Sequence, residues 1–139
     1  MGFWWDQTST DKATQVVEKV VAGINNRDFA ALDGLITDDV SFTDSMGGRV
    51  AGREDAMLLL KQLLAYDPGF EIRLDDVTPH NDMVLATGYT MGHRQQTAER
   101  TLWRLRIRDG LLAEWRSYSA DAPRPMVQML MGAPVRARA

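Results

Sequence analysis

Apolar residues recur with helical spacing in three segments of the first half of the chain. The longest stripe predicts an amphipathic helix over about 10–24 and comprises Val16, Val17, Val20, Val21 and Ile24. A short helix follows Asp28, a residue type that caps helix N-termini; its buried side comprises Phe29, Leu32, Leu35 and Ile36. A third helix over about 53–66 presents Met57, Leu60, Leu63 and Leu64.

The second half of the chain alternates apolar and polar residues with the period of two that is typical of strands. Four such segments are 70–77, 83–93, 99–108 and 111–120, and an opening strand at about 39–45 lies between the second and third helices. Asp109-Gly110 predicts a two-residue hairpin turn between the last two strands. Since short hairpins join neighbouring strands, we expect a mainly antiparallel sheet with helices packed on it, an α+β fold.

With 139 residues, the chain is expected to form a single domain over 1–139. Its core should span about 10–120, with a loose tail from about residue 132. The segment "MVQMLM" (126–131) can form either one more helical turn or a strand. Its apolar residues and those at Phe3-Trp4-Trp5 could cover a cavity or extend an interface between subunits.

Alternation within the strands identifies the side chains that should face the helices. In 99–108 the odd positions, with Trp103 among them, are mostly apolar, whereas Arg occupies most even positions. Trp115 and Ser117 form an inward set on the next strand. In 83–93 we place the bulky residues inside, including Tyr89, Met91 and His93. Large aromatic residues interspersed with hydroxyls are typical of an apolar pocket, although a packed core with satisfied hydroxyls is the alternative.

Asp44 interrupts the pattern of the opening strand. It falls on the same face as Val40 and Phe42, where a core residue is expected. Three explanations are open: the strand register is misread, Asp44 caps the turn at 45–48, or Asp44 is a functional group in a cavity.

Charge and composition narrow the possible functions. The net charge of −3 gives no support for nucleic-acid binding, and the even Arg positions of 99–108 are expected to cover an exposed or subunit-facing surface, with phosphate binding as the alternative. The chain has no cysteine, no apolar run long enough for a membrane span and no signal-peptide pattern, so we expect a cytoplasmic protein. No ligand cluster or phosphate loop implies a metal or an organic cofactor.

Two segments carry a resemblance to a known superfamily: "NRDFAALDGLITDDVSFTDSMGGRVAGREDAMLLLKQLL" and "IRDGLLAEWRSYS". The chain resembles the nuclear-transport-factor-2-like superfamily over about residues 12–120, and within it the SnoaL-like and ketosteroid-isomerase-like branch. The resemblance implies a cone-shaped fold with three N-terminal helices on a curved sheet around a pocket. It also implies a homodimer.

The resemblance assigns a role to Asp44, because it matches the aspartate that serves as general base in the isomerases. A carboxylate at the edge of an apolar cavity can abstract a proton beside a bound carbonyl. The oxyanion donors of the isomerases are not matched, since the first helix has no Tyr and the late-strand acid position falls at Leu102 or Trp103.

Two functions remain open. The first is an isomerase, lyase or cyclase that acts on a small apolar carbonyl compound, with Asp44 as base. In this function Trp103, Trp115, Tyr89, Met91 and Ser117 would contact the ligand, and His93 would be a second polar group. The second is a non-catalytic dimeric module that binds a ligand with the same scaffold.

Overall fold

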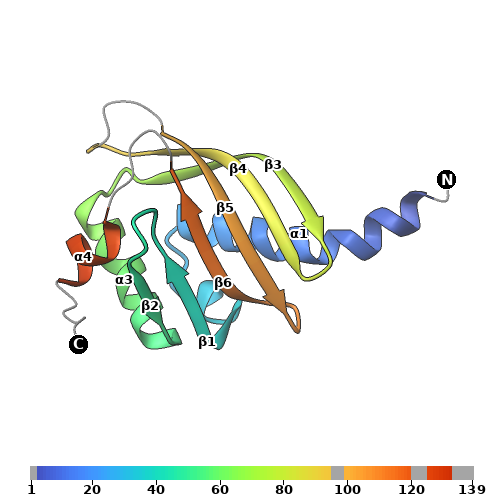
Figure 1. Cartoon of the computed structure of the whole chain (residues 1–139), viewed down its shortest axis with the longest axis horizontal. Helices are drawn as coiled ribbons and strands as arrows, with labels where there is room; N and C mark the ends of the chain where they lie inside the picture. Colours follow the sequence, from blue (N-terminus) through green and yellow to red (C-terminus); the bar gives the residue numbers. More distant parts are fainter. Residues whose placement is uncertain (1–2, 95–98, 120–124, 133–139) are drawn as a thin grey trace.

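The computed structural model describes residues 3–94, 99–119 and 125–132, with side chains from residue 12 onward (Figure 1). Helices and strands follow in the order α1 (Phe3–Asn25), α2 (Phe29–Asp33), β1 (Ile36–Thr43), β2 (Arg49–Ala51), α3 (Arg53–Tyr66), β3 (Glu71–His80), β4 (Met83–Met91), β5 (Glu99–Arg108), β6 (Leu111–Tyr118) and α4 (Met126–Met131). The expected tail beyond residue 132 lies outside the described residues.

The strands form one sheet of six in the order β2-β1-β6-β5-β4-β3 (Figure 1). Every neighbouring pair is antiparallel except β1 and β6, which run parallel. The predicted α+β fold with a curved, mainly antiparallel sheet is confirmed. The helix count is corrected, because the segment 126–131 forms a fourth helix, α4, at the C-terminal side.

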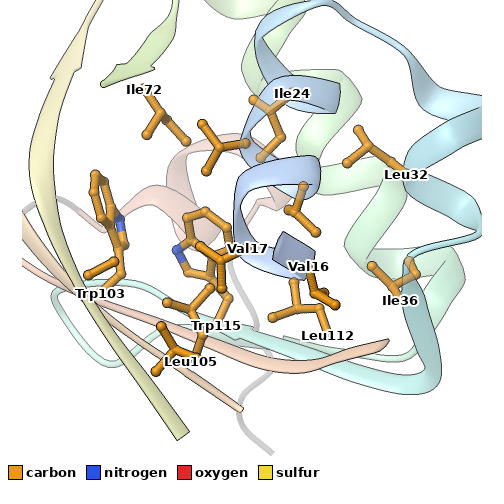
Figure 2. Close-up of a cluster of buried hydrophobic side chains, with 14 of the residues drawn as sticks. Val16, Val17, Ile24, Leu32, Ile36, Ile72, Trp103, Leu105, Leu112 and Trp115 are labelled. Atoms are coloured by element: carbon orange, nitrogen blue, oxygen red, sulfur yellow. The ribbon is translucent and has the colours of Figure 1, made fainter. Parts of the chain in front are cut away.

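Helix α1 supplies much of the core. It begins at Phe3 rather than near residue 10, and Figure 1 shows it running past the sheet at its N-terminal end. Its buried residues include Val17, which is fully buried, and Ile24. Figure 2 shows these side chains in one cluster with Leu105 and Trp115 from the strands. The amphipathic stripe of the sequence therefore packs against the concave face of the sheet.

The second helix is shorter than predicted. Asp28 caps it as expected, since its side chain accepts a hydrogen bond from the N–H of Ala31 at 3.1 Å. It ends at Asp33, and the predicted helical residue Ile36 begins β1 instead. Ile36 pairs with Leu112 of β6, whose N–H donates to the carbonyl of Leu35 at 2.8 Å. This partner is distant in sequence, so local periodicity could not reveal it.

The bulky residues of β4 face outward, so the predicted orientation of this strand is wrong. Val84 and Ala86 are 0% and 1% exposed, whereas Leu85 is 46% exposed. Gly88 is also on the buried face, and a Cβ there would lie 1.9 Å from the carbonyl oxygen of Arg73 on β3. Position 88 therefore requires glycine, because the backbone of the neighbouring strand lies too close for a side chain.

The last hairpin agrees with its sequence pattern. Asp109 and Gly110 both have positive φ, 55° and 76°, as the predicted turn type requires. On β5 the odd positions are buried and comprise Thr101, Trp103, Leu105 and Ile107. Arg100 and Arg104 are exposed on the other face. Among the described residues, no helix combines the length and apolar character needed to cross a membrane.

Candidate functional site

A cavity of about 200 Å³ lies between the concave face of the sheet and helices α1, α3 and α4. Its walls are largely apolar, and the side chains that define them include Val20, Ile24, Leu60, Leu63, Trp103 and Trp115. The first two come from α1, the next two from α3 and the tryptophans from the sheet. The side chains therefore enclose an open cavity, whereas the alternative interpretation was a packed core.

Two tryptophans shape the sheet side of the cavity. The rings of Trp103 on β5 and Trp115 on β6 meet edge to face, with centroids 6.0 Å apart and an interplanar angle of 64°. Ser117, which pairs with Trp103 across the two strands, also lines the cavity. Of the six ligand-binding residues expected from the sequence, these three lie together on the wall.

The other three expected residues are not on the cavity wall. Tyr89 is on the outer face of β4, where its hydroxyl accepts a hydrogen bond from the Arg100 guanidinium at 2.5 Å. Met91 shares the odd register of this strand and does not line the cavity. His93 follows β4 and is exposed, with its ring against Gly69, where a Cβ would come within 2.4 Å of the ring. The sequence analysis predicted all three to face inward because it assigned the wrong face of β4 to the interior.

Asp44 is 1% exposed and its two carboxylate oxygens are engaged by backbone groups. Oδ1 accepts from the N–H of Met46 at 2.9 Å and of Gly48 at 2.8 Å. Oδ2 accepts from the N–H of Val127 on α4 at 2.8 Å. The neighbouring Ser45 lines the cavity, but Asp44 does not. These contacts support the turn-capping alternative, and the bond from Val127 also links the turn to α4. The general-base role stays a prediction.

Asp67 makes a similar set of contacts at the end of α3. Its Oδ1 accepts from the N–H groups of His93 at 2.8 Å and Gly69 at 3.2 Å, and its Oδ2 accepts from that of Arg94 at 3.2 Å. Burial acts to raise the pKa of Asp67, but these backbone donors outweigh it and hold the pKa below its ordinary value. The carboxylate joins α3 to the segment after β4.

Helix α4 covers one side of the cavity. Met126, Met129 and Leu130 all contribute to the wall. Val127, on another side of the helix, is 5% exposed and packs in a small cluster with Val50 and Leu59. The apolar C-terminal segment therefore covers the cavity, which was one of the two roles that its composition left open.

One end of the cavity carries polar groups from neighbouring strands. They are Thr90, Glu99, Thr101, Ser117 and Ser119. The sequence reading missed Glu99 as a wall residue, although it shares the odd register of Thr101 and Trp103 on β5. Within the described ranges, no group of three or more His, Cys, Asp and Glu side chains could hold a metal ion.

A curved six-stranded sheet, wrapped by helices around an apolar cavity, defines the class of NTF2-like α+β proteins. Within this class the chain belongs to the SnoaL-like domain family, which matches residues 17–115. No curated protein matches the chain.

Solved structures share this fold at low sequence identity. An LEH-like epoxide hydrolase from M. tuberculosis is 22% identical, with a TM-score of 0.71, over 88% of this chain and 92% of that one. A provisionally assigned ketosteroid isomerase from Kribbella flavida is 16% identical, with a TM-score of 0.71, over 84% and 83% of the two chains. An NTF2-like protein of unknown function from Cytophaga hutchinsonii is 13% identical, with a TM-score of 0.66, over 77% and 88%. These similarities establish the fold alone.

Proposed function

We propose that the protein binds a small, largely apolar molecule in the cavity between the sheet and helices α1, α3 and α4. The observation that carries this proposal is the cavity of about 200 Å³, with Trp103 and Trp115 on one wall and leucines of α3 opposite. Ligand sites are typically concave, mostly apolar and equipped with a few polar groups, as this cavity is. Its volume suits a ligand of one or two rings.

Binding without catalysis is the function that the contacts of Asp44 favour. To act as a base, this side chain would have to reach past its own turn, because Ser45 and not Asp44 lines the cavity, and the hydrogen bonds from Met46, Gly48 and Val127 hold it in place. Such bonds to a charged group are among the stronger ones in proteins.

The alternative is an isomerase, lyase or cyclase that uses Asp44 as general base. One observation favours it: Ser45, the next residue, lines the cavity, so Asp44 lies only one position behind the wall. Under this alternative, Asp44→Asn would abolish turnover of a carbonyl substrate while ligand binding persists. Equal turnover by the variant and the parent would remove Asp44 from the mechanism.

The binding proposal is tested by filling the cavity. Ser117→Phe places a ring on the cavity wall, and Leu58→Phe places the same ring on the exposed side of helix α3, away from the cavity wall, as a control. Calorimetric titration with bicyclic hydrophobic compounds should give binding for the parent and the control but not for Ser117→Phe. Circular dichroism should confirm that all three proteins are folded. Equal binding by Ser117→Phe would locate the ligand elsewhere.

We also propose that the protein is a homodimer that pairs through the outer face of its sheet. Leu85, Leu102 and Tyr118 are 46%, 39% and 38% exposed there, on the neighbouring strands β4, β5 and β6. The small residues of β4 do not contribute to this face, because they point inward. Light scattering should give a dimer mass for the parent and a monomer mass for Leu102→Glu. A monomeric parent would refute the pairing.

A further inference from the structure

We infer that the ligand of this cavity is a neutral alcohol or phenol whose hydroxyl lies between Glu99 and Ser119. This inference rests on the proposed binding function and specifies the chemistry of the ligand. It is drawn from the polar end of the cavity.

The strand register brings these polar groups onto one patch of the inner face. Thr90 of β4 pairs with Glu99 of β5, so their side chains are neighbours on that face. The pairing of β5 with β6 includes Leu102 with Tyr118, and one further residue along this register Thr101 lies opposite Ser119. Glu99 and Ser119 are then diagonal neighbours, and both line the cavity.

Ser119 has an unmet hydrogen-bonding capacity. Its Oγ is buried and has no hydrogen-bond partner among the described residues. Buried hydroxyls in proteins are nearly always hydrogen-bonded, either to protein groups or to an ordered water. Because this hydroxyl is on the cavity wall, a ligand in the cavity can supply the partner.

A carboxylate and a serine hydroxyl at the same end of the cavity favour some polar groups on a ligand over others. The Glu99 carboxylate accepts hydrogen bonds, whereas the Ser119 hydroxyl can donate one. A ligand hydroxyl can donate to Glu99 and accept from Ser119 at the same time. A ligand carboxylate can only accept, and it would meet Glu99 and Asp67, the two charged side chains among the described residues of the wall. A ligand ammonium can donate to both groups, but its transfer beside Trp103 and the leucines would cost its hydration.

Four compounds with one apolar body test this selection: indane, 2-indanol, 2-aminoindane and indane-2-carboxylate. Calorimetric titration at pH 7 should give 2-indanol roughly tenfold tighter binding than indane, as expected for hydrogen bonds that include a charged acceptor. The carboxylate should bind most weakly. Equal affinity for 2-indanol and indane, or tighter binding of 2-aminoindane than of 2-indanol, would overturn the inference while leaving cavity binding intact. If none of the four binds, the proposed function itself fails.

Ser119→Ala identifies the group responsible. The variant should lose most of the advantage of 2-indanol over indane while its affinity for indane stays unchanged. Since the Oγ has no partner in the described part of the chain, its removal should leave the free energy of unfolding unchanged or raise it. Glu99→Gln should also weaken 2-indanol selectively, and Glu71→Gln, a half-buried glutamate on β3 that is not on the cavity wall, is the matched control. Undiminished preference for 2-indanol in both Ser119→Ala and Glu99→Gln would refute the placement of the hydroxyl.

Discussion

Replacing Asp44 by Asn separates the capping role of this residue from its predicted role as a base. The substitution keeps the shape of the side chain and exchanges one acceptor oxygen for an NH₂ group, which only donates. Asp44 faces backbone donors on both sides, the N–H groups of Met46 and Gly48 at Oδ1 and that of Val127 at Oδ2. An asparagine can satisfy one side only, so the better arrangement keeps the turn and turns its NH₂ toward the N–H of Val127.

The cost follows from this arrangement. One charge-assisted hydrogen bond is lost and a buried donor is left without an acceptor, which amounts to about 1–3 kcal/mol of the free energy of unfolding. With a urea dependence of roughly 2 kcal/mol per molar, the midpoint of unfolding should fall by about 0.5–1.5 M. Helix α4 should be affected most, because the bond to Val127 is the one that cannot be kept.

Urea denaturation of the parent, Asp44→Asn and Asp75→Asn measures this cost. Asp75 is exposed on β3, so its substitution should change stability by less than about 0.5 kcal/mol. Hydrogen exchange should show earlier opening of α4 in Asp44→Asn. If Asp44→Asn were as stable as Asp75→Asn, the bonds to the backbone would contribute little, and the reasoning for a cap would be refuted.

Three further predictions concern the sheet and its connections. Gly88→Ala should lower the free energy of unfolding measured in urea by about 1–3 kcal/mol or more, because its Cβ would lie 1.9 Å from the Arg73 carbonyl oxygen. A variant as stable as the parent would contradict this close approach. Leu105→Ala should cost about 2–5 kcal/mol, whereas Leu58→Ala, at an exposed position of α3, should cost far less; equal costs would disprove the burial assigned to Leu105. The lowered pKa of Asp67 means that its contribution to stability is complete above the ordinary pKa of 3.8 and is lost as pH falls through the lower folded-state pKa. Asp67→Asn should therefore lower the free energy of unfolding at pH 7, and this free energy should fall less steeply than in the parent as the solution is acidified. An unchanged pH dependence in acid would contradict this prediction.

Sequence reasoning succeeded where local patterns and tertiary structure agree. The helix over 53–66 and the hairpin at Asp109-Gly110 depend on side-chain periodicity and on backbone preferences of one or two residues. The alternation of β5 also predicted which of its residues are buried, because one side of this strand faces the helices and the other does not. Trp103, Trp115 and Ser117 were found on the cavity wall for this reason.

Sequence reasoning failed where a distant part of the chain decides the outcome. The orientation of β4 depends on how closely neighbouring backbone approaches Gly88, which side-chain size alone does not reveal. Ile36 joins a strand because β6 pairs with it, although the residues before it have helical spacing. The contacts of Asp44 include a partner on α4 that no local pattern around the turn could indicate.

The bond between Asp44 and Val127 joins residues that are 83 positions apart in the chain. At a synthesis rate of about 5–20 residues per second, its acceptor is synthesised roughly 4–17 seconds before its donor. During that interval the turn after β1 can form its own hydrogen bonds, but the wall supplied by α4 is absent and the apolar interior remains open to water. Helix α4, the last of the described helices, therefore closes a cavity whose other walls are synthesised earlier. A nascent chain that ends before residue 126 should expose this interior to chaperones and hydrophobic dyes.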